Sequence, residues 1–424
     1  MDLKYNGKEE YLKIYIDSYR KISTIQLMNS INSSLDIQFY YYISDDPKKE
    51  ESEKISPGPS VFRPSNVKPE PIIDYIDTTV YKSDISQEIH SKYSNYASFV
   101  VRLYEESPLV EVDWVVGPVP IDDGLGKDVF LRYSTDLDNF GTFYTDANGR
   151  QTIKRIRHMR ATYQPYNLDP VAGNYYPVNS KIYIEDTKRN LRLSIFNDRS
   201  QGGSSLIDGA IDFLVHRRIL TDDTGAQTFL NDTIENQGVV IRGKHYLYFT
   251  KANYRPNKVY EKRLAKEIEL SPKVFVSVYD DWENTTNEFT ALRNKLPIGV
   301  HLLSLEEWND HTLLLRLENY LEKSDIVKSG NKIVKIKDLF VNIKINIVKE
   351  TTLAAHMWFK DWVPLHWQMN ESFYKSFNDY YGLGNMELCK NEIIRPFEEV
   401  DLDEGISLTP QQIRTFVVWF EYLK

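Results

Sequence analysis

The chain has 424 residues, of which 41% are hydrophobic and 27% are charged, a composition ordinary for a globular protein with a sizeable core. Its formal net charge of −9 argues against a nucleic-acid partner, because phosphate binding requires a basic surface and the lysines and arginines here are dispersed. No apolar run approaches the roughly eighteen residues of a membrane-spanning helix, so we expect no membrane span. The length favours two or three domains.

The first half of the chain combines a long polar segment with strand signals. Ser44–Pro71 is crowded with charged residues and prolines, which predicts a long exposed loop. Val112–Val116 has the β-branched and aromatic composition that is typical of a strand.

The middle of the chain contains the predicted domain boundary. Arg255–Pro272 is charged and connects two β-rich blocks, and Val259–Ile268 within it is the best candidate for a short helix. We therefore predict a large domain over residues 1–265 and a smaller one over residues 273–424.

Strand patterns continue in the C-terminal part. Val341–Ile347 alternates apolar and polar residues with a period of two, and Phe275–Tyr279 has strand composition. His301–Leu305 and Leu313–Leu317 are predicted to form a hairpin with a longish loop, and Ile413–Phe420 a closing strand. With 29 Tyr, 19 Phe and 7 Trp, the chain is predicted to be mostly β, an antiparallel β-sandwich protein.

Three motif clusters follow one another closely, at residues 143–150, 172–179 and 198–205. In the first cluster, Asn148-Gly149 predicts a turn between strands, because both residue types tolerate positive φ. In the third, Gly202-Gly203 predicts a turn or a close backbone approach, since the Lys-Ser/Thr ending of a phosphate-binding loop is missing.

The chain lacks the sequence patterns of a zinc site. None of its eight histidines lies in a His-Glu-x-x-His or a His-x-Asp pattern, so we predict no zinc centre inside this chain. His216 stands beside two arginines and is predicted to be structural or solvent-facing. Cys389 is the only cysteine and excludes an internal disulfide. Asp222-Asp223 is predicted to form a turn, and a pair of catalytic carboxylates is the less favoured interpretation.

Targeting and modification signals are sparse. The N-terminus, Met1–Gly7, is polar and has no apolar core of a signal peptide. Four Asn-x-Ser/Thr patterns are candidates for N-glycosylation, about as many as chance produces in such a chain: Asn32, Asn231, Asn284 and Asn370.

In this order and spacing the three clusters resemble the C-terminal portion of the lysosomal-type α-mannosidases of glycoside hydrolase family 38. The resemblance covers nearly the whole chain. It also includes Val100–Tyr104, Glu111–Trp114, Val240–His245, Val300–Leu303, Leu315–Glu318, Glu350–Leu353 and Ile413–Phe416.

The resemblance implies a large antiparallel β-sandwich of the galactose-mutarotase-like supersandwich type, lacking its first strands, followed by a smaller terminal β-sandwich. It further implies a partner, the N-terminal α-mannosidase domain, which would carry the zinc and the nucleophilic aspartate of a retaining enzyme that cleaves terminal α-mannose from mannose-containing glycans. We therefore expect no catalytic residue and no metal ligand in this chain. The full-length protein would be lysosomal or secreted.

The resemblance also points to candidate substrate-binding residues. An arginine that flanks the substrate in the family matches Arg217, with Arg218 as its neighbour, and a guanidinium can donate several hydrogen bonds to sugar hydroxyls. A salt bridge inside the sandwich is an equally weighted alternative. Ser60 stands where the family has a tyrosine that reaches the sugar, so this contact should be lost.

Two functions remain open from the sequence. The first is the non-catalytic half of an α-mannosidase, incomplete without its N-terminal partner. The alternative is a non-catalytic secreted protein, derived from an α-mannosidase, that binds carbohydrate or is purely structural.

Overall fold

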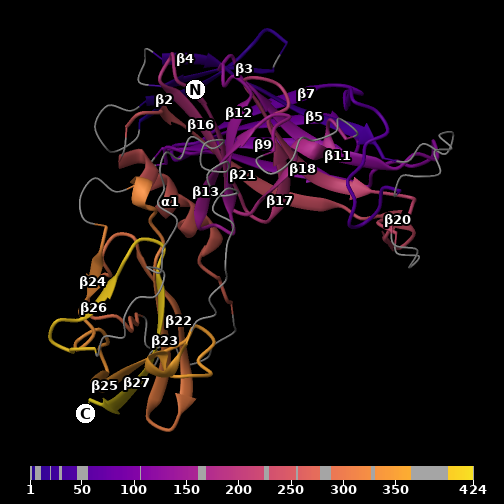
Figure 1. Cartoon of the computed structure of the whole chain (residues 1–424). Coiled ribbons are helices and arrows are strands. Elements are labelled where there is room, and N and C mark those ends of the chain that lie inside the picture. The colour runs from indigo at the N-terminus through magenta and orange to yellow at the C-terminus, as the bar shows by residue number, and fades with distance from the viewer. Residues whose placement is uncertain are drawn as a thin grey trace. The chain divides into compact units, whose positions relative to one another are not determined.

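The computed structural model of the chain forms two compact units. It describes residues 2–4, 11–19, 21–27, 31–44, 56–105, 107–160, 169–223, 229–254, 256–276, 288–325, 330–363 and 400–423. Unit 1 comprises Met1–Tyr254 with Glu267–Glu269, and unit 2 comprises Arg255–Lys266 with Leu270–Lys424. Figure 1 labels the helices and strands of both units.

The largest layer of unit 1 is a nine-stranded antiparallel sheet with the order β13-β12-β15-β16-β21-β10-β9-β8-β7. Besides hairpin neighbours it contains long-range pairs such as β10 with β21, so the sheet joins segments far apart in the sequence. The strands are β7 (Asp77–Lys82), β8 (Ser86–Ser94), β9 (Ala97–Tyr104), β10 (Val110–Val116), β12 (Thr142–Ala147), β13 (Gln151–Ile156), β15 (Lys181–Asp186), β16 (Leu191–Asn197) and β21 (Ile241–Lys251).

The second layer is a six-stranded antiparallel sheet with the order β14-β17-β18-β11-β5-β6. Its strands are β5 (Asp36–Ile43), β6 (Glu70–Pro71), β11 (Lys127–Ser134), β14 (Tyr176–Val178), β17 (Gln201–Ser204) and β18 (Ala210–Arg218). Unit 1 also holds a four-stranded sheet of β1 (Asp2–Lys4), β2 (Tyr11–Ile16), β3 (Ile22–Leu27) and β4 (Ile31–Ser34), the ribbon of β19 (Thr233–Ile234) and β20 (Gln237–Gly238), and the 3₁₀ turn η1 (Ala172–Asn174).

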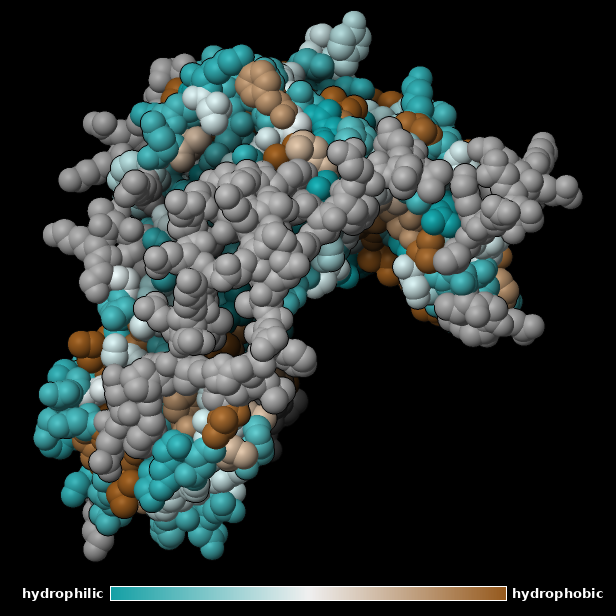
Figure 2. Space-filling model, viewed as in Figure 1, coloured by the Kyte–Doolittle hydropathy of each residue, from teal (hydrophilic) through white to brown (hydrophobic). Residues whose placement is uncertain are grey.

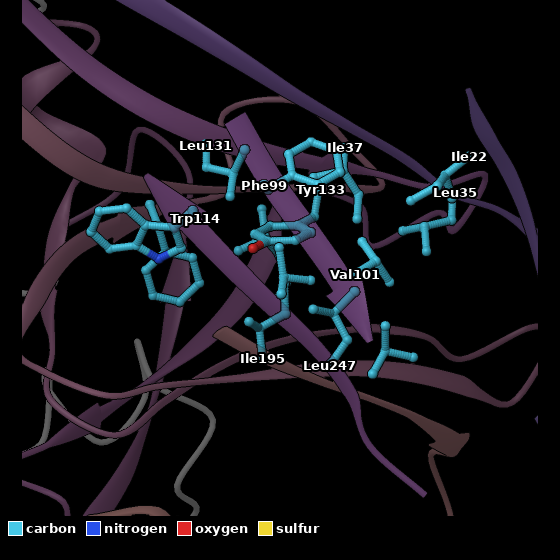
Figure 3. Close-up of a cluster of buried hydrophobic side chains, with 14 of the residues drawn as sticks. Ile22, Leu35, Ile37, Phe99, Val101, Trp114, Leu131, Tyr133, Ile195 and Leu247 are labelled. Atoms are coloured by element: carbon cyan, nitrogen blue, oxygen red, sulfur yellow. The ribbon is translucent and has the colours of Figure 1, made fainter. Parts of the chain in front are cut away.

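The main core lies between the nine-stranded and six-stranded sheets, as Figure 3 shows. β11 sends Leu131 and Tyr133 into it, whereas Phe130 from the same strand stacks on Tyr42 at the opposite face. Both faces of β11 are therefore covered, which explains why nearly every residue of this strand is buried. Each large apolar side chain buried here contributes about 1.5–3 kcal/mol to folding. Labelled in Figure 3 are Ile22, Leu35, Ile37, Phe99, Val101, Trp114, Leu131, Tyr133, Ile195 and Leu247.

Unit 2 is a smaller β structure that includes most of helix α1 (Pro256–Glu269). Its four-stranded antiparallel sheet has the order β22-β23-β27-β25 and packs through one apolar cluster against the pair β24-β26. The strands are β22 (Val300–Asn309), β23 (Thr312–Asn319), β24 (Lys332–Val334), β25 (Ile343–Thr351), β26 (Ile406–Leu408) and β27 (Ile413–Tyr422), with the 3₁₀ turns η3 (Lys323–Asp325) and η4 (Phe359–Asp361).

Charged pairs hold α1 to unit 2. Lys262 Nζ lies 2.7 Å from Glu322 Oε1, and Lys266 Nζ lies 3.2 Å from Glu318 Oε1, whose side chain is only 1% exposed. Glu318 also accepts from His301, so its buried carboxylate is compensated from two sides.

The structure confirms the predicted mostly β fold with antiparallel sheets. The strands expected at Val112–Val116 and Ile413–Phe420 and the helix at Val259–Ile268 are present as β10, β27 and α1. In the described part of the chain, no helix is long and apolar enough to cross a membrane. On the surface visible in Figure 2, hydrophilic residues predominate in both units and hydrophobic ones form scattered groups.

Three local expectations were wrong. The hairpin of β22 and β23 has a tight turn at Asp310-His311 instead of a longish loop. Phe275 and Val276 lie outside any strand and are more than nine-tenths exposed, while residues 277–279 lie outside the described residues. In β25 a bulge between Ile345 and Ile347 breaks the period of two, so Ile347 is 49% exposed.

Candidate functional site

The described part of the predicted exposed loop, from residue 56 onward, contains a tight turn at Gly58–Val61. Gly58 and Val61 exchange backbone hydrogen bonds of 3.0 and 3.3 Å. The N–H of Ser60 donates to Asp223 Oδ2 at 2.7 Å, and Thr221 Oγ1 donates to the carbonyl of Pro57 at 2.6 Å. The turn is thus fixed to the segment that follows β18.

Arg217, near the end of β18, holds the same turn from the other side. Its Nη2 donates to the carbonyl of Val61 at 3.0 Å, and its Nη1 donates to that of Pro59 at 3.4 Å. These two carbonyls flank Ser60. Ser60 is exposed, and its hydroxyl has no hydrogen-bond partner among the residues that the structure describes.

A buried carboxylate orients Arg217. In the register of β11 and β18, Asp128 lies opposite Arg217, and Arg217 Nε donates to Asp128 Oδ1 at 2.6 Å. The Asp128 side chain is fully buried and also accepts from the hydroxyl of Ser44. A buried ionised carboxylate is tolerated only when paired and hydrogen-bonded, and both conditions are met here.

Gly58 is required by the close contact with Asp223. A Cβ at Gly58 would lie 2.6 Å from the backbone nitrogen of Asp223 and 2.7 Å from its carboxyl carbon, closer than real Cβ contacts. A larger residue would therefore displace the turn from the segment that holds it.

An aromatic cluster packs around Phe62, the residue that follows the turn. Phe62 contacts Tyr175 edge to face with ring centroids 5.0 Å apart, and it lies 6.2 Å from the ring of Tyr42. Beneath these rings, Arg132 and Asp212 form a buried two-point ion pair of 2.7 and 2.8 Å. Burial raises the pKa of the Tyr175 hydroxyl well above its ordinary value, so this side chain stays neutral.

Arg217 and Arg218 are adjacent in the sequence, but their side chains bind different groups in the structure. Arg218 donates from Nε to Asn231 Oδ1 at 2.7 Å and from Nη1 to the carbonyl of Val119 at 2.6 Å. The structure brings Arg217 and Ser60 to one place and holds Arg218 elsewhere. His216 bonds the carbonyl of Val239 at 2.9 Å, and burial lowers its pKa, which fits a structural role.

The other predicted positions are distributed over the surface. Asn32 is exposed on β4 and accepts from Gln26, and Asn231 is half-buried beside Arg218. Asn284 and Asn370 lie outside the described residues. Asn148-Gly149 forms the predicted turn between β12 and β13 with positive φ at both residues. Gly202-Gly203 makes a close backbone approach inside β17.

No metal centre is assembled in the described ranges of the chain, where three or more histidine, cysteine, aspartate or glutamate side chains nowhere converge. These residues therefore do not fit a resident zinc ion.

The sequence interpretation missed Asp128 and Ser44 as parts of the site, and treated Asp223 as a turn residue. Asp128 is separated from Arg217 by 89 positions, and Asp223 from Ser60 by 163. The pairing of β11 with β18 brings Asp128 to Arg217, and this pairing cannot be predicted from a single sequence.

The two packed antiparallel sheets of unit 1 define a β-sandwich protein. Residues 61–225 match the glycosyl hydrolases family 38 C-terminal domain. The chain is 37% identical to lysosomal alpha-mannosidase of Mus musculus, over 98% of this chain and 40% of that protein. It is 39% identical to lysosomal alpha-mannosidase of Bos taurus, over 89% of this chain and 36% of that protein.

A solved structure agrees with this relationship at the level of fold. An alpha-mannosidase from Enterococcus faecalis V583 superposes with a TM-score of 0.54 at 11% identity, covering 98% of this chain and 43% of that chain. The chain thus belongs to glycoside hydrolase family 38 and carries its C-terminal portion. It spans about 40% of the length of the curated relatives that it matches.

Proposed function

We propose that this chain is the C-terminal half of a retaining, zinc-dependent α-mannosidase that hydrolyses terminal α-mannose from glycans, and that it is not catalytically complete alone. The observation that carries the proposal is the match along 98% of this chain to only 40% of a lysosomal alpha-mannosidase. The partner is the N-terminal α-mannosidase domain, which would bind the zinc ion and supply the nucleophile. The complete protein would act in the lysosome or after secretion.

The requirements of retaining hydrolysis indicate which half of the protein would carry the catalytic residues. The reaction needs a carboxylate nucleophile and a second carboxyl group about 5 Å away. In this chain, Arg217, Asp128 and Asp223 are all engaged in holding the Gly58–Val61 turn. We therefore assign these side chains to binding and positioning, and assign the bond cleavage to the partner.

Within this proposal the Gly58–Val61 turn flanks the substrate. Ser60 lies exposed at its tip, at the position of the family tyrosine, and its shorter side chain does not replace the contact that a tyrosine would make with the sugar. Arg217 acts through the turn, because its donors at Nε and Nη2 are used by Asp128 and Val61. Arg218 donates a hydrogen bond to Asn231, the asparagine of a sequon, and would stabilise the surface beside the turn in this way. The proposed domains remain residues 1–265 and 273–424.

The test compares this chain with the complete polypeptide that includes the preceding α-mannosidase domain. With a chromogenic α-mannoside and added zinc, the complete polypeptide should turn over substrate with retention at the anomeric carbon, and this chain alone should not. Turnover by this chain in a preparation free of other proteins would contradict the division of labour. Inversion would contradict the retaining mechanism.

One observation favours the alternative, a non-catalytic secreted protein that binds carbohydrate or is structural. Serine at position 60 is too short to reach a sugar that a tyrosine would contact, so a substrate contact is reduced. A complete polypeptide that binds mannose-containing glycans without hydrolysing them would support this alternative. Turnover would exclude it.

A further inference from the structure

The outer face of the four-stranded sheet in unit 2 carries an unusual aromatic group. Phe416 and Val418 of β27 point into the core, so Trp419 between Val418 and Phe420 points to the opposite face. Its cross-strand neighbour on β25 is Ile347, which is 49% exposed. Val417 and its cross-strand partner Leu314 lie on the same face and are buried, so the apolar surface of this face reaches solvent at Ile347 and at the half-buried Trp419.

A turn after β25 brings a second indole onto the first. Thr352 N–H donates to the carbonyl of Met357 at 3.0 Å, and Ala355 N–H donates to that of Thr352 at 2.9 Å. A bridge between Thr351 and Trp358 closes the turn. The rings of Trp358 and Trp419 are stacked at 28° with centroids 6.3 Å apart, and Trp358 remains 37% exposed.

Two charged side chains border the indoles. Lys349 Nζ lies 5.9 Å from the ring centroid of Trp358 and 5.5 Å from that of Trp419. Glu421 follows two residues after Trp419 and therefore lies on the same face of β27. Both are exposed, and neither has an ion-pair partner among the residues that the structure describes. We call Ile347, Lys349, Trp358, Trp419 and Glu421 the indole patch.

We propose that the indole patch binds a neutral pyranose ring of a glycan. The apolar C–H face of such a ring can lie against an indole, while its hydroxyls accept from the ammonium of Lys349 and donate to the carboxylate of Glu421. If an apolar protein surface covered the patch, both charges would be buried without partners. The free-energy cost of burying them would exceed the gain from burying the indoles. The chemistry of the patch therefore favours a sugar.

The turn makes this surface ready for a ligand. Because Trp358 is held by backbone hydrogen bonds and by stacking on Trp419, little side-chain entropy is lost when a sugar docks. The patch lies outside residues 61–225, the range that matches the family 38 domain. The proposal stands on unit 2 alone and does not depend on the function proposed above.

The experiment titrates the full chain with methyl α-mannoside, methyl α-glucoside and methyl α-galactoside and follows the indole N–H signals by NMR. Saturable shifts of the Trp358 and Trp419 signals in the millimolar range are expected for at least one sugar. Trp358→Ala should abolish binding. Lys349→Gln, an exposed change that leaves the fold intact, should weaken it roughly fivefold, the effect of one lost hydrogen bond.

The matched control is Trp362→Ala. Trp362 is 38% exposed in the same segment but contacts Phe359 rather than the patch, so binding should be unchanged. No saturable shift at tens of millimolar of any of the three sugars would overturn the proposal. So would a shift that persists in both Trp358→Ala and Lys349→Gln. Self-association of the chain that Trp358→Ala removes, without sugar binding, would assign the patch to a second copy instead.

Discussion

Tyr133 of β11 and His245 of β21 share a hydrogen bond of 2.7 Å across the interior of the large sandwich. The amide nitrogen of Gln201 donates to Leu214, so its Oε1 must accept, and His245 Nε2 at 2.9 Å must carry the proton. His245 Nδ1 is then the acceptor from Tyr133. The imidazole is fully buried, and burial favours its neutral form.

This arrangement predicts that acid weakens unit 1. Burial lowers the pKa of His245 from 6.5 to about 3. Below pH 6.5 the unfolded chain binds a proton that the folded chain does not, so the stabilising contribution is complete above pH 6.5 and is lost as the pH falls toward 3. Between pH 7 and 4.5 we expect a loss of about 3 kcal/mol in the free energy of unfolding. Denaturant titrations measure it, with His245→Gln as the variant.

His245→Gln should be less stable at pH 7 but should lose less stability on acidification, because the titrating group is gone. His158→Gln, at an exposed position in the turn after β13, is the control for replacing a histidine by glutamine outside the core. Equal slopes for the wild type and for His245→Gln would show that other groups govern the acid response.

Removal of the Asp128 carboxylate should destabilise unit 1 and free the Gly58–Val61 turn. Asp128→Ala leaves Arg217 half-buried without its anion and Ser44 without its acceptor, and removing one partner of a buried pair costs about 3–5 kcal/mol. Thermal unfolding monitors the loss. Lys337→Ala removes an ion pair with Asp403 that is fully exposed and should leave the transition in place. A loss for Asp128→Ala no larger than for Lys337→Ala would rule out this role of Asp128.

Gly58→Ala should loosen the turn without unfolding the sandwich. The added methyl meets the backbone of Asp223 at 2.6 Å, so the hydrogen bond from Ser60 N–H to Asp223 must lengthen or break. Amide exchange at Ser60 and Val61 should speed up by at least tenfold while the melting temperature changes little. Gly173→Ala, whose nearest neighbour would be 3.9 Å away, is the matched control. Unchanged exchange at Ser60 would argue against a tightly fixed turn.

Two of the four sequons can be tested against their surroundings. Asn32 is exposed on β4, whereas Asn231 is half-buried and accepts a hydrogen bond from Arg218 at its Oδ1. A glycan on Nδ2 leaves Oδ1 free to accept, so both positions are compatible with modification, and Asn32 should be the more completely occupied. Mass spectrometry of the chain from a secretory host, with Ser34→Ala and Thr233→Ala as sequon-breaking variants, measures each occupancy. Higher occupancy at Asn231 would contradict the reasoning from exposure.

Patterns with a short period were readable from the sequence, and contacts over a long distance were not. The strand composition at β10, the apolar run at β27 and the Asn148-Gly149 turn predicted local structure correctly, because neighbouring residues determine it. The bulge in β25 was missed, since its extra residue is fixed by the register with β27. Phe275 and Val276 show that strand composition alone does not make a strand without a partner.

For the candidate site, the resemblance to the family pointed to Arg217 and Ser60. The structure shows why the two residues lie close together: Arg217 binds the carbonyls on either side of Ser60. The alternative of a salt bridge for Arg217 corresponds to its pair with Asp128. The carboxylates of Asp128 and Asp223 come from segments whose sequence has no distinguishing motif. Their role depends on strand order, which is a property of the whole sheet.

The Gly58–Val61 turn is assembled from chain segments that are remote in sequence. Asp128 lies 84 positions after Ser44, and the partners of Ser60 and Val61 lie 163 and 156 positions away. Contacts of such separation form late, after the closure of the loops between them. The turn around Ser60 can therefore form only after the strands that carry its distant partners have come together, so an ordered turn marks a chain whose sandwich is already assembled.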